Sequence, residues 1–514
     1  MTNTPAPADT DPSDDPDTAA HEDDISPGLR ESGEDRKVLL RKRIGLFAGP
    51  VLALLTFLIL PGDLAQPARL TATIAVMMAV WWMSEAIPLA ATALLPLVLF
   101  PVFNVAEVGD AAKPYANPII FLFMGGFMLA VAMQRWNLHR RIALKTVLLV
   151  GTRPRQLIVG FMIATGFMSM WVSNTATAVM MLPIGMSVLA LTARMSEDKA
   201  VPPKFGVALM LGIAYSASIG SLGTIIGTPP NALMVGYLQQ AHDIHVGFGQ
   251  WMLVGVPMSA LFMFLAWYLL TFVMFKPEIT ELPGGREMIS DEYRKLGPMG
   301  RGETLVLIVF ILAAAAWITV PLVWEDTNIE DAVIAMCVAL ALFIVPASLT
   351  KGSPLLDWGS AKELPWDILL LFGGGLALSA QFTATGLSQW VGEQVGGLGF
   401  LPIVVLVAIV ALIVLVLTEL TSNTATAAAF LPLIGGVAVG LGLDPMILVV
   451  PVAIAATCAF MLPVATPPNA IAFSSGYVEI SNMLKAGVWL NLISLVLTTL
   501  TTLTLAAWVF GFLY

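Results

Sequence analysis

Polar side chains of the same kind stand twice in the middle of long apolar stretches. The sequence SNTATA occupies residues 173–178 and recurs letter for letter at 422–427, and TPPNA occupies 228–232 and recurs at 466–470. Ser, Thr and Asn side chains compete with the hydrogen bonds of a helix and favour caps and turns. A Pro-Pro pair removes two backbone donors and ends the helix before it. The motifs therefore predict four helix breaks, two in each half of the chain.

A broken helix offers ligands that an intact helix does not. The free N–H groups and the positive dipole end of a half-helix attract an anion. Unwound carbonyls and hydroxyl oxygens suit a hard cation such as Na⁺, and Asn offers a carbonyl to a cation and an amide N–H₂ to a carboxylate. The alternative is that Ser and Thr only join helices by hydrogen bonds. Two copies of SNT, each followed by TPPN, favour a binding site over that alternative.

Basic side chains are missing from the sequence around all four motifs. Residues 156–193, 205–275 and 364–484 contain no Lys or Arg. An anion bound there would have to be neutralised by helix ends and by a co-bound metal ion. We therefore expect that any anion binds together with a cation.

Three acidic residues, Glu85, Asp367 and Glu419, stand in or beside apolar stretches. Ionisable residues at such positions are functional candidates by default. Glu419 comes three residues before Ser422, close enough to shape the second SNT region. For Glu419 we favour a structural, hydrogen-bonded role, and direct contact with a ligand stays open as the alternative.

The elements that carry these motifs are expected to be membrane helices. The 514 residues are 57% hydrophobic and only 12% charged, with a mean hydropathy of +0.84, which excludes an ordinary soluble globular protein. Apolar stretches that could form spanning helices of about 20 residues recur along the chain, among them one at 117–150. The stretches 155–193 and 401–440 are too long for one span and carry SNT near their centres, while 204–240 and 446–475 are interrupted by Pro-Pro.

Acidic charge is concentrated at the N-terminus. Residues 1–36 carry eleven Asp or Glu against Arg30 and Arg36, while the rest of the chain carries 23 basic and 24 acidic side chains. This Pro-rich segment is typical of disorder, and no signal peptide is expected because the apolar run starts only at Ile44. Cys337 and Cys458 lie in apolar runs and predict neither a disulfide framework nor a Cys metal site.

The two halves form an internal duplication. The offset of 249 between the SNT motifs also relates Phe123–Gly126 to Phe372–Gly375, and the TPPN motifs follow at an offset of 238. Motifs in the same order at related offsets indicate a repeat. Six Lys or Arg lie between residues 135 and 155, whereas 384–404 contain none. Because basic residues collect in cytoplasmic loops, the repeat is expected to be inverted, with the N-terminus in the cytoplasm.

Paired SNTAT motifs, GTPPNA at 227–232 and CAFMLPVATPPNA at 458–470 resemble those of the divalent anion/sodium symporter family, over nearly everything after about residue 40. The resemblance implies an all-α polytopic membrane protein built as an inverted-topology repeat. It implies about eleven transmembrane helices plus two re-entrant hairpins, with broken helices at the binding site. It also implies a homodimer that works by an elevator mechanism, in which a transport domain moves against a scaffold.

Placed on this chain, the resemblance and the charge pattern predict four parts. An acidic, disordered cytoplasmic tail takes residues 1–36, and a cytoplasmic linker takes residues 276–303. The first half is 37–275, with a hairpin at about 155–193 and a broken helix at about 204–240. The second half is 304–514, with a hairpin at about 401–440 and a broken helix at about 446–475.

The resemblance also implies the residues of the site. The substrate carboxylates would be held by Ser173, Asn174, Thr175, Thr228, Ser422, Asn423, Thr424, Thr466 and Pro467. One sodium site would use Ser169, Ser173, Asn174 and the carbonyl of Gly227, and the other would use Thr418, Ser422, Asn423 and the carbonyl of Ala465. Gly220 and Gly223 are alternatives for the carbonyl of the first sodium site.

The expected function is secondary active transport across the cell (inner) membrane, namely Na⁺-coupled uptake of C4-dicarboxylates such as succinate, fumarate and malate. Na⁺ is the expected co-transported ion, and neither an organic cofactor nor a nucleic-acid partner is expected. The alternatives are a sodium-independent dicarboxylate exchanger of the same family, or transport of citrate or sulfate. An enzyme is not expected, because no nucleophile with a base and no facing carboxylates are visible. A channel is disfavoured, because the broken helices carry no repeated ring of charges.

Overall fold

A computed structural model describes residues 36–151, 153–195, 202–279, 281, 284–323, 329–348, 352–395 and 401–512. These ranges are almost entirely helical, and their only β-type pairing is an isolated bridge between Pro346 and Pro354. Residues 1–35 of the acidic tail lie outside the described residues, and Arg36 begins the first helix.

The first half contains two pairs of helices that flank the motifs. It begins with α2 (Arg36–Ile59), α3 (Gln66–Ser84), α4 (Leu89–Thr92), α5 (Leu95–Val102), α6 (Val108–Ala112), η3 (Lys113–Ala116), α7 (Pro118–Arg135) and α8 (Leu138–Val150). The first SNT lies between α9 (Pro154–Ser169) and α10 (Asn174–Met195), and the first TPPN lies where α11 (Pro203–Ser221) gives way to α12 (Pro229–His242). Next come α13 (Phe248–Tyr268), its π-helical extension η4 (Leu269–Met274) and α14 (Gly285–Lys295).

The second half has the same plan. It begins with α15 (Arg301–Val323), α16 (Asp331–Ile344), α17 (Trp358–Ala361), α18 (Trp366–Ala384) and α19 (Leu387–Val395). The second SNT lies between α20 (Ile403–Thr418) and α21 (Asn423–Gly440), and the second TPPN between α22 (Met446–Thr457) and α23 (Pro467–Ser474), with a short 3₁₀ turn, η6 (Pro463–Ala465), in the gap. The chain closes with α24 (Ile480–Thr501), the π-helical η7 (Thr502–Ala506) and α25 (Ala507–Phe510).

Nine helical segments of the described ranges are long and apolar enough to cross a membrane. Four further apolar helices are shorter, namely Leu89–Val102, Asp331–Ile344, Ile403–Thr418 and Met446–Thr457. The last two lead into the second SNT and the second TPPN. Proline begins the half-helices α12 and α23 because the first N–H groups of a helix have no intrahelical partner. The all-helical membrane fold expected from composition is confirmed.

One apolar stretch, 117–150, is two helices rather than one. α7 ends at Arg135, and Asn137 takes the left-handed conformation with φ of 56° before α8 begins. Asn tolerates this conformation better than most residues. The Trp136 indole anchors the turn by donating to the carbonyl of Leu355 over 2.8 Å. The apolar run 117–150 is therefore longer than the helix α7 that it was expected to form.

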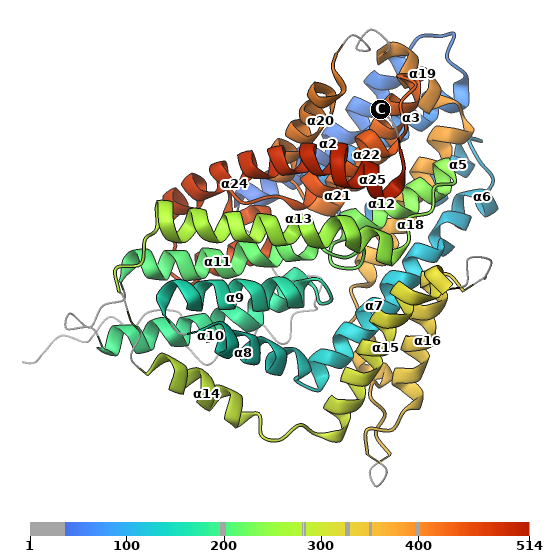
Figure 1. The fold of residues 1–514 in the computed structure, drawn as a ribbon. Coiled ribbons are helices and arrows are strands. Elements are labelled where there is room, and N and C mark those ends of the chain that lie inside the picture. Colours follow the sequence, from blue (N-terminus) through green and yellow to red (C-terminus); the bar gives the residue numbers. More distant parts are fainter. Residues whose placement is uncertain are drawn as a thin grey trace, which may run out of the picture.

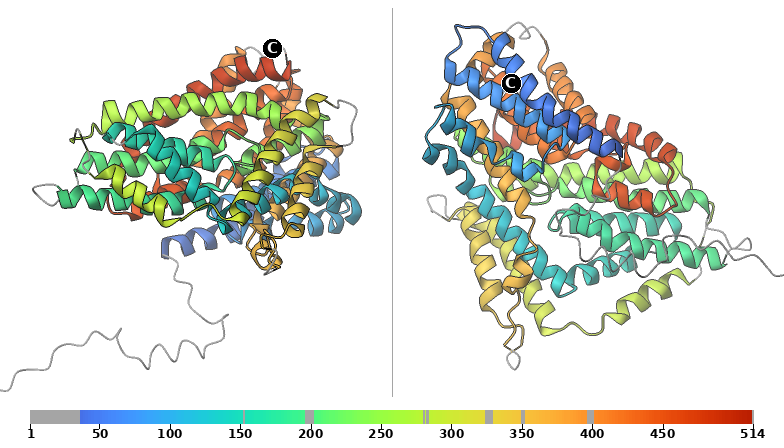
Figure 2. Two further views of the ribbon diagram at one scale, coloured as in Figure 1. Left: turned by 60° about the horizontal axis from the view of Figure 1, so that its bottom comes forward. Right: turned by 180° about the vertical axis from the view of Figure 1, so that it is seen from behind.

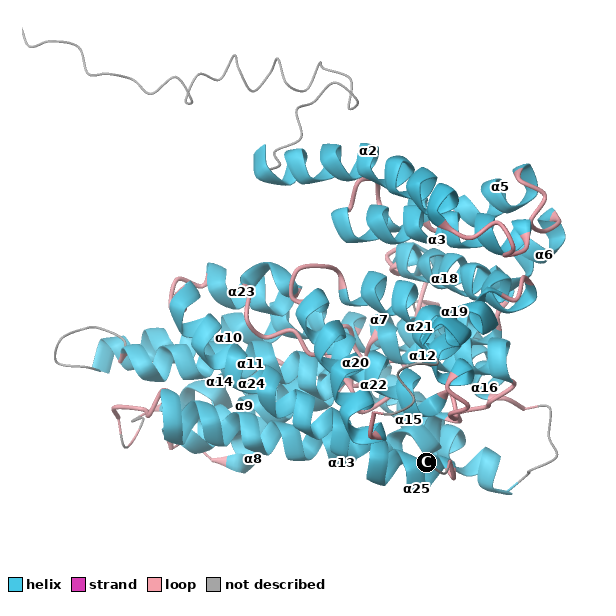
Figure 3. Cartoon of the chain, turned by 90° about the horizontal axis from the view of Figure 1, so that it is seen from above, coloured by secondary structure: helices cyan, strands magenta, loops and turns pink. Residues whose placement is uncertain are grey.

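The motif-bearing helices pack side by side. α9, α11 and α13 run alongside one another in Figure 1, and α10 lies beside α11. Figure 2 shows the same bundle from two other sides, with α7, α15 and α16 crossing it at an angle. In Figure 3, α2 and α3 form a separate layer on one face, whereas α8 and α13 lie at the opposite face.

The Gly-rich segments of α7 and α18 allow close approach between helices. A Cβ on Gly125 would lie 2.5 Å from the carbonyl oxygen of Ala335 in α16, and one on Gly374 would lie 2.4 Å from that of Ala93. The Phe123 and Phe372 rings meet edge to face, with their centroids 4.9 Å apart. The repeated aromatic-glycine segments thus bring equivalent helices of the two halves together.

Candidate functional site

The first SNT tip is bonded to the first broken helix. The Ser169 hydroxyl lies 2.6 Å from Oδ1 of Asn174 and 2.6 Å from the carbonyl oxygen of Ala217 in α11. The Asn174 amide reaches Oγ of Ser221 over 3.4 Å, and the Thr224 hydroxyl donates to the carbonyl of Met170 over 2.5 Å. Both ends of the hairpin tip are therefore attached to the break between α11 and α12.

The second SNT tip repeats this arrangement. The Thr418 hydroxyl lies 2.7 Å from Oδ1 of Asn423 and 2.7 Å from the carbonyl oxygen of Ala456 in α22. Ser169 and Thr418 are both completely buried. A hydroxyl carries one hydrogen and satisfies one acceptor at a time. Each half thus contains three crowded oxygens that share a single proton, an arrangement that suits a small cation.

The asparagine of each TPPN motif clamps the unwound segment before it. The Asn231 amide donates to the carbonyls of Leu222 and Thr224 at 3.4 and 2.9 Å. The Asn469 amide donates to those of Ala459 and Leu462 at 3.1 Å each. Both asparagines are fully buried. For the carbonyls of Thr224 and Ala459 the asparagine is the only donor among the described residues, whereas the Leu222 carbonyl also accepts the Trp251 indole and the Leu462 carbonyl also accepts the N–H of Ala465. Because an unpaired carbonyl at membrane depth is costly, the asparagines stabilise the unwound segments.

The two breaks meet through their threonines. Thr228 precedes the first turn of α12 without capping it by a side-chain hydrogen bond, and its hydroxyl lies 3.3 Å from that of Thr457 at the end of α22. Thr466 caps α23 by accepting the N–H of Asn469 over 3.3 Å. Thr228 and Thr466 are buried, whereas Pro467 is exposed.

The SNT side chains remain open to a ligand. Ser173 and Thr175 are exposed, and Asn174 is half-buried. In the second tip, Ser422, Asn423 and Thr424 are all half-buried. No hydrogen bond joins the two tips to each other in the described part of the chain. The structure therefore brings each tip to its own break rather than to the other tip.

The carbonyls expected to bind sodium differ in whether they already accept a hydrogen bond. The Gly220 carbonyl accepts the N–H of Gly223 over 3.0 Å. The carbonyls of Gly227 and Ala465 accept no hydrogen bond within the described ranges. Gly227 stands directly before the first TPPN break and Ala465 directly before the second, so their carbonyls are the ones left free.

Glu419 organises the second break rather than facing the SNT tip. Its carboxylate accepts the N–H groups of Phe460, Met461 and Leu462 at 2.7 to 3.3 Å. It also accepts the side-chain amide of Asn491 in α24 over 2.7 Å. The residue is 5% exposed. The hydrogen-bonded structural role favoured from the sequence is the one observed.

Glu85 and Asp367 lie away from the motifs. Glu85 is half-buried, with a partly exposed carboxylate that forms an ion pair with Arg41 of α2 over 2.9 Å. Asp367 stands in the first turn of α18, where a negative charge is favourable. Neither residue contributes to the candidate site.

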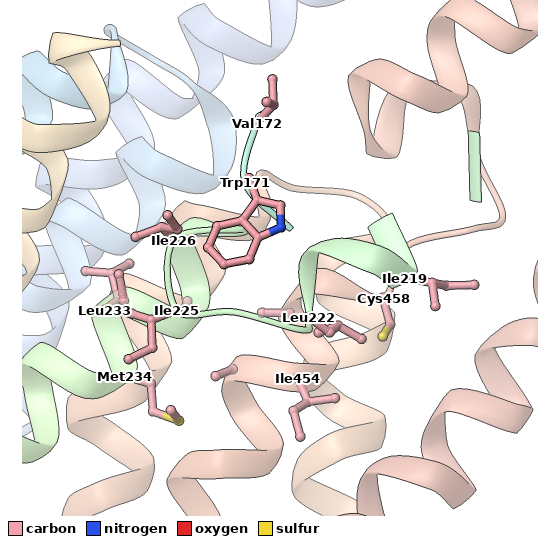
Figure 4. Close-up of a cluster of buried hydrophobic side chains, with 14 of the residues drawn as sticks. Trp171, Val172, Ile219, Leu222, Ile225, Ile226, Leu233, Met234, Ile454 and Cys458 are labelled. Carbon is pink, nitrogen blue, oxygen red and sulfur yellow. The ribbon is translucent and has the colours of Figure 1, made fainter. Parts of the chain in front are cut away.

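Apolar side chains surround the first break. Figure 4 shows Trp171, at the tip of the first hairpin, beside Ile225 and Ile226 of the unwound segment, with Ile454 and Cys458 contributed by the second half. All five are buried. A low-dielectric surrounding strengthens the interaction between an ion and the polar groups that remain.

Some partners of the site have no sequence signal. The carbonyls of Ala217 and Ala456 accept hydrogen bonds from the buried hydroxyls. A backbone carbonyl is present at every residue, so a sequence motif cannot identify these two. Asn491 lies 72 residues after Glu419, too far along the chain to be paired with it by spacing. No group of three or more His, Cys, Asp or Glu able to hold a metal occurs among the described residues.

Comparisons with known proteins agree with the motifs. The model of the sodium:sulfate symporter transmembrane region matches residues 41–512. A sodium-dependent dicarboxylate transporter, SdcS, of Staphylococcus saprophyticus is 42% identical over 487 residues, which cover 93% of this chain and 94% of that protein. SdcS of Staphylococcus aureus strain USA300 is 43% identical over 466 residues, covering 89% and 90%.

Solved structures show a similar fold at low identity. The YdaH transporter of Alcanivorax borkumensis gives a TM-score of 0.55 at 13% identity, covering 87% of this chain and 99% of that one. MtrF of Neisseria gonorrhoeae gives 0.50 at 14% identity, covering 87% and 97%. At this identity the likeness concerns the fold alone. On the match of nearly the whole chain and the 42% identity, the protein belongs to the sodium:sulfate symporter family, the divalent anion/sodium symporters that its motifs resemble.

Proposed function

We propose that this protein takes up C4-dicarboxylates such as succinate, fumarate and malate, driven by inward flow of Na⁺. The observation that carries the proposal is the pair of oxygen clusters at Ser169 and Thr418, each with three oxygens and one shared proton. Na⁺ entering such a cluster is held by the Asn oxygen and by hydroxyl and carbonyl oxygens. Two relatives that are each named a sodium-dependent dicarboxylate transporter support the same function.

The substrate would bind beside these cations. Ser173, Thr175, Ser422 and Thr424 carry accessible hydroxyls next to the asparagines, and these offer donors to carboxylate oxygens. With no Lys or Arg in residues 156–193 or 364–484, the carboxylates would be neutralised by Na⁺ and by helix N-termini. In this proposal the substrate residues also include Thr228, Thr466 and Pro467, and the free carbonyls of Gly227 and Ala465 complete the sodium sites.

The movement we propose is of the elevator type. The hairpins α9–α10 and α20–α21 and the broken helices would move as one body against the remaining helices, in a homodimer. The two halves would be inverted relative to each other, with the N-terminus and the linker 276–303 in the cytoplasm. The hydrogen-bond patterns that attach each tip to its own break support a rigid body of this composition.

Uptake into proteoliposomes tests the coupling. We expect labelled succinate to accumulate when Na⁺ is high outside and not when choline replaces Na⁺. Asn174→Ala and Asn423→Ala should each weaken the apparent affinities for Na⁺ and succinate. Ser187→Ala is the matched control, because that exposed hydroxyl only bonds back to Pro183 of its own helix.

Two results would reject parts of the proposal. Accumulation that is unchanged in choline would replace symport with a sodium-independent exchange. Unchanged Na⁺ dependence and affinity in both asparagine variants would reject the site assignment while leaving the transport activity in place.

A further inference from the structure

One end of the molecule carries a set of basic side chains that have no ionic partner. Six exposed cations form no ion pair within the described part of the chain. We call them the basic face: Lys145, Arg153, Arg194, Lys204, Lys276 and Arg286. Among the described residues of the same elements, exposed acids without a cationic partner are fewer, namely Glu278, Glu281 and Glu287. The face therefore has a positive excess.

Contacts between elements place these cations together. The Glu278 carboxylate, just beyond η4, accepts the N–H groups of Lys204 and Phe205 at the start of α11 over 3.0 and 3.1 Å. The Trp267 indole donates to the carbonyl of Arg155 at the start of α9 over 3.0 Å. α14 packs against α8, and these bonds tie the ends of α9, α11 and η4 to one another.

The N-terminus begins at the same end. Arg41 in α2 pairs with Glu85 at the end of α3, so these two ends adjoin. α4–α5 then crosses away and α7 crosses back, which returns the chain to that side at α8. In Figure 3, α2 begins toward the side where α10 and α14 lie. The segment before Arg36 therefore emerges on the side of the basic face.

We propose that the acidic segment 1–35 docks on the basic face and acts as a brake on transport. The segment carries eleven Asp or Glu and one Arg, which complements the positive excess. Its 35 residues can reach at most about 125 Å, and a tethered segment has an effective concentration of the order of millimolar. These features favour the chain's own tail over a free anionic partner.

The basic face lies on helices that would have to move relative to each other during transport, and this is why a docked tail would slow transport. Arg153, Arg194 and Lys204 stand on the ends of α9, α10 and α11, which carry the first SNT and lead into the first break. Lys145 and Arg286 belong to α8 and α14. A docked tail bridges these two groups of helices and resists any shift of one against the other. Because the contact is between exposed charges, added salt screens and weakens it. The Debye length is about 8–10 Å at physiological ionic strength.

Direct binding tests the docking without reference to transport. A labelled peptide of residues 1–35 is titrated onto protein lacking those residues, in neutral detergent without Na⁺ gradient or substrate. We expect saturable binding that weakens at least tenfold between 30 and 300 mM salt. The peptide with every Asp and Glu replaced by Asn and Gln should not bind. Binding that is absent, or equal for both peptides, would overturn the proposal.

Variants locate the surface. Arg153→Gln combined with Lys204→Gln and Arg286→Gln should reduce peptide binding at least tenfold. Lys113→Gln is the matched control for the single variant Arg153→Gln, because Lys113 is exposed, forms no ion pair within the described ranges and lies beyond the α4–α5 crossing. Equal loss in these two single variants would mean that the peptide responds only to net charge, which also overturns the assignment.

Transport tests the brake, in vesicles of neutral phosphatidylcholine. Removing residues 1–35 should raise the maximal uptake rate about threefold to tenfold at low salt and change it little at high salt. If the full-length protein and the protein lacking residues 1–35 transport at equal rates at both salt concentrations, the brake is refuted. If the triple variant instead changes the response to added phosphatidylglycerol while tail removal has no effect, lipid headgroups occupy the face and the proposal is wrong.

Discussion

Replacing Glu419 by Gln probes how the second break is held in shape. The carboxylate has two oxygens and four donors around it, three of them backbone N–H groups of residues 460–462. A glutamine supplies one oxygen and one N–H₂ group. In its better orientation the oxygen keeps the bonds from Phe460, Met461 and Asn491. The N–H₂ group then faces the N–H of Leu462, which has no acceptor.

The magnitude follows from those contacts. Hydrogen bonds to a charged acceptor contribute about 1.5–3 kcal/mol and neutral ones about 1 kcal/mol, so the three retained bonds lose about 1 kcal/mol each. The unpaired N–H of Leu462 costs a further 1–3 kcal/mol or so. The sum is about 4–6 kcal/mol, and 4 kcal/mol corresponds to a shift of nearly a thousandfold toward a disordered break. We expect apparent Na⁺ and succinate affinities to fall at least tenfold in Glu419→Gln.

The assay is the concentration dependence of uptake, with thermal unfolding in detergent measured on the same preparations. Glu393→Gln is the control, because Glu393 is exposed on α19 and only accepts a bond from Gln389 over 3.2 Å. A Glu419→Gln protein that melts like the parent and keeps both affinities within twofold would refute the reasoning. It would mean that the backbone of residues 460–462 keeps its shape without the carboxylate.

Two other substitutions test the framework around the site. Arg141→Met should destabilise the protein by about 3–5 kcal/mol, because it leaves the carboxylate of Glu303 buried and unpaired. The double variant Arg141→Met with Glu303→Leu should recover most of that loss in thermal unfolding. Gly220→Ala should lower the folded yield, because its Cβ would lie 2.2 Å from a backbone oxygen of α9. Gly109→Ala, with nothing within 4 Å, should be neutral.

The sequence predicted the parts of the site whose chemistry resides in side chains. Asn231 and Asn469 stand at fixed places in repeated motifs, and both were expected beside a helix break. Their clamping of carbonyls follows from what a buried amide must do. The turn at Asn137 was missed, because α7 and α8 are both apolar and only one residue takes a left-handed conformation. Hydropathy averages over such a residue, so helix length was overestimated there.

The repeat predicts equivalent positions but not equivalent chemistry. Met170 and Glu419 each follow the buried hydroxyl residue of their half, yet only Glu419 can accept backbone N–H groups. In the first half the Thr224 hydroxyl acts at the break instead, accepting the N–H of Gly227 over 3.0 Å and donating to Met170. One break is therefore held by a neutral hydroxyl and the other by a carboxylate. Since neither the motifs nor their offsets record this difference, the two halves must be probed by separate substitutions, and results from one half do not transfer to the other.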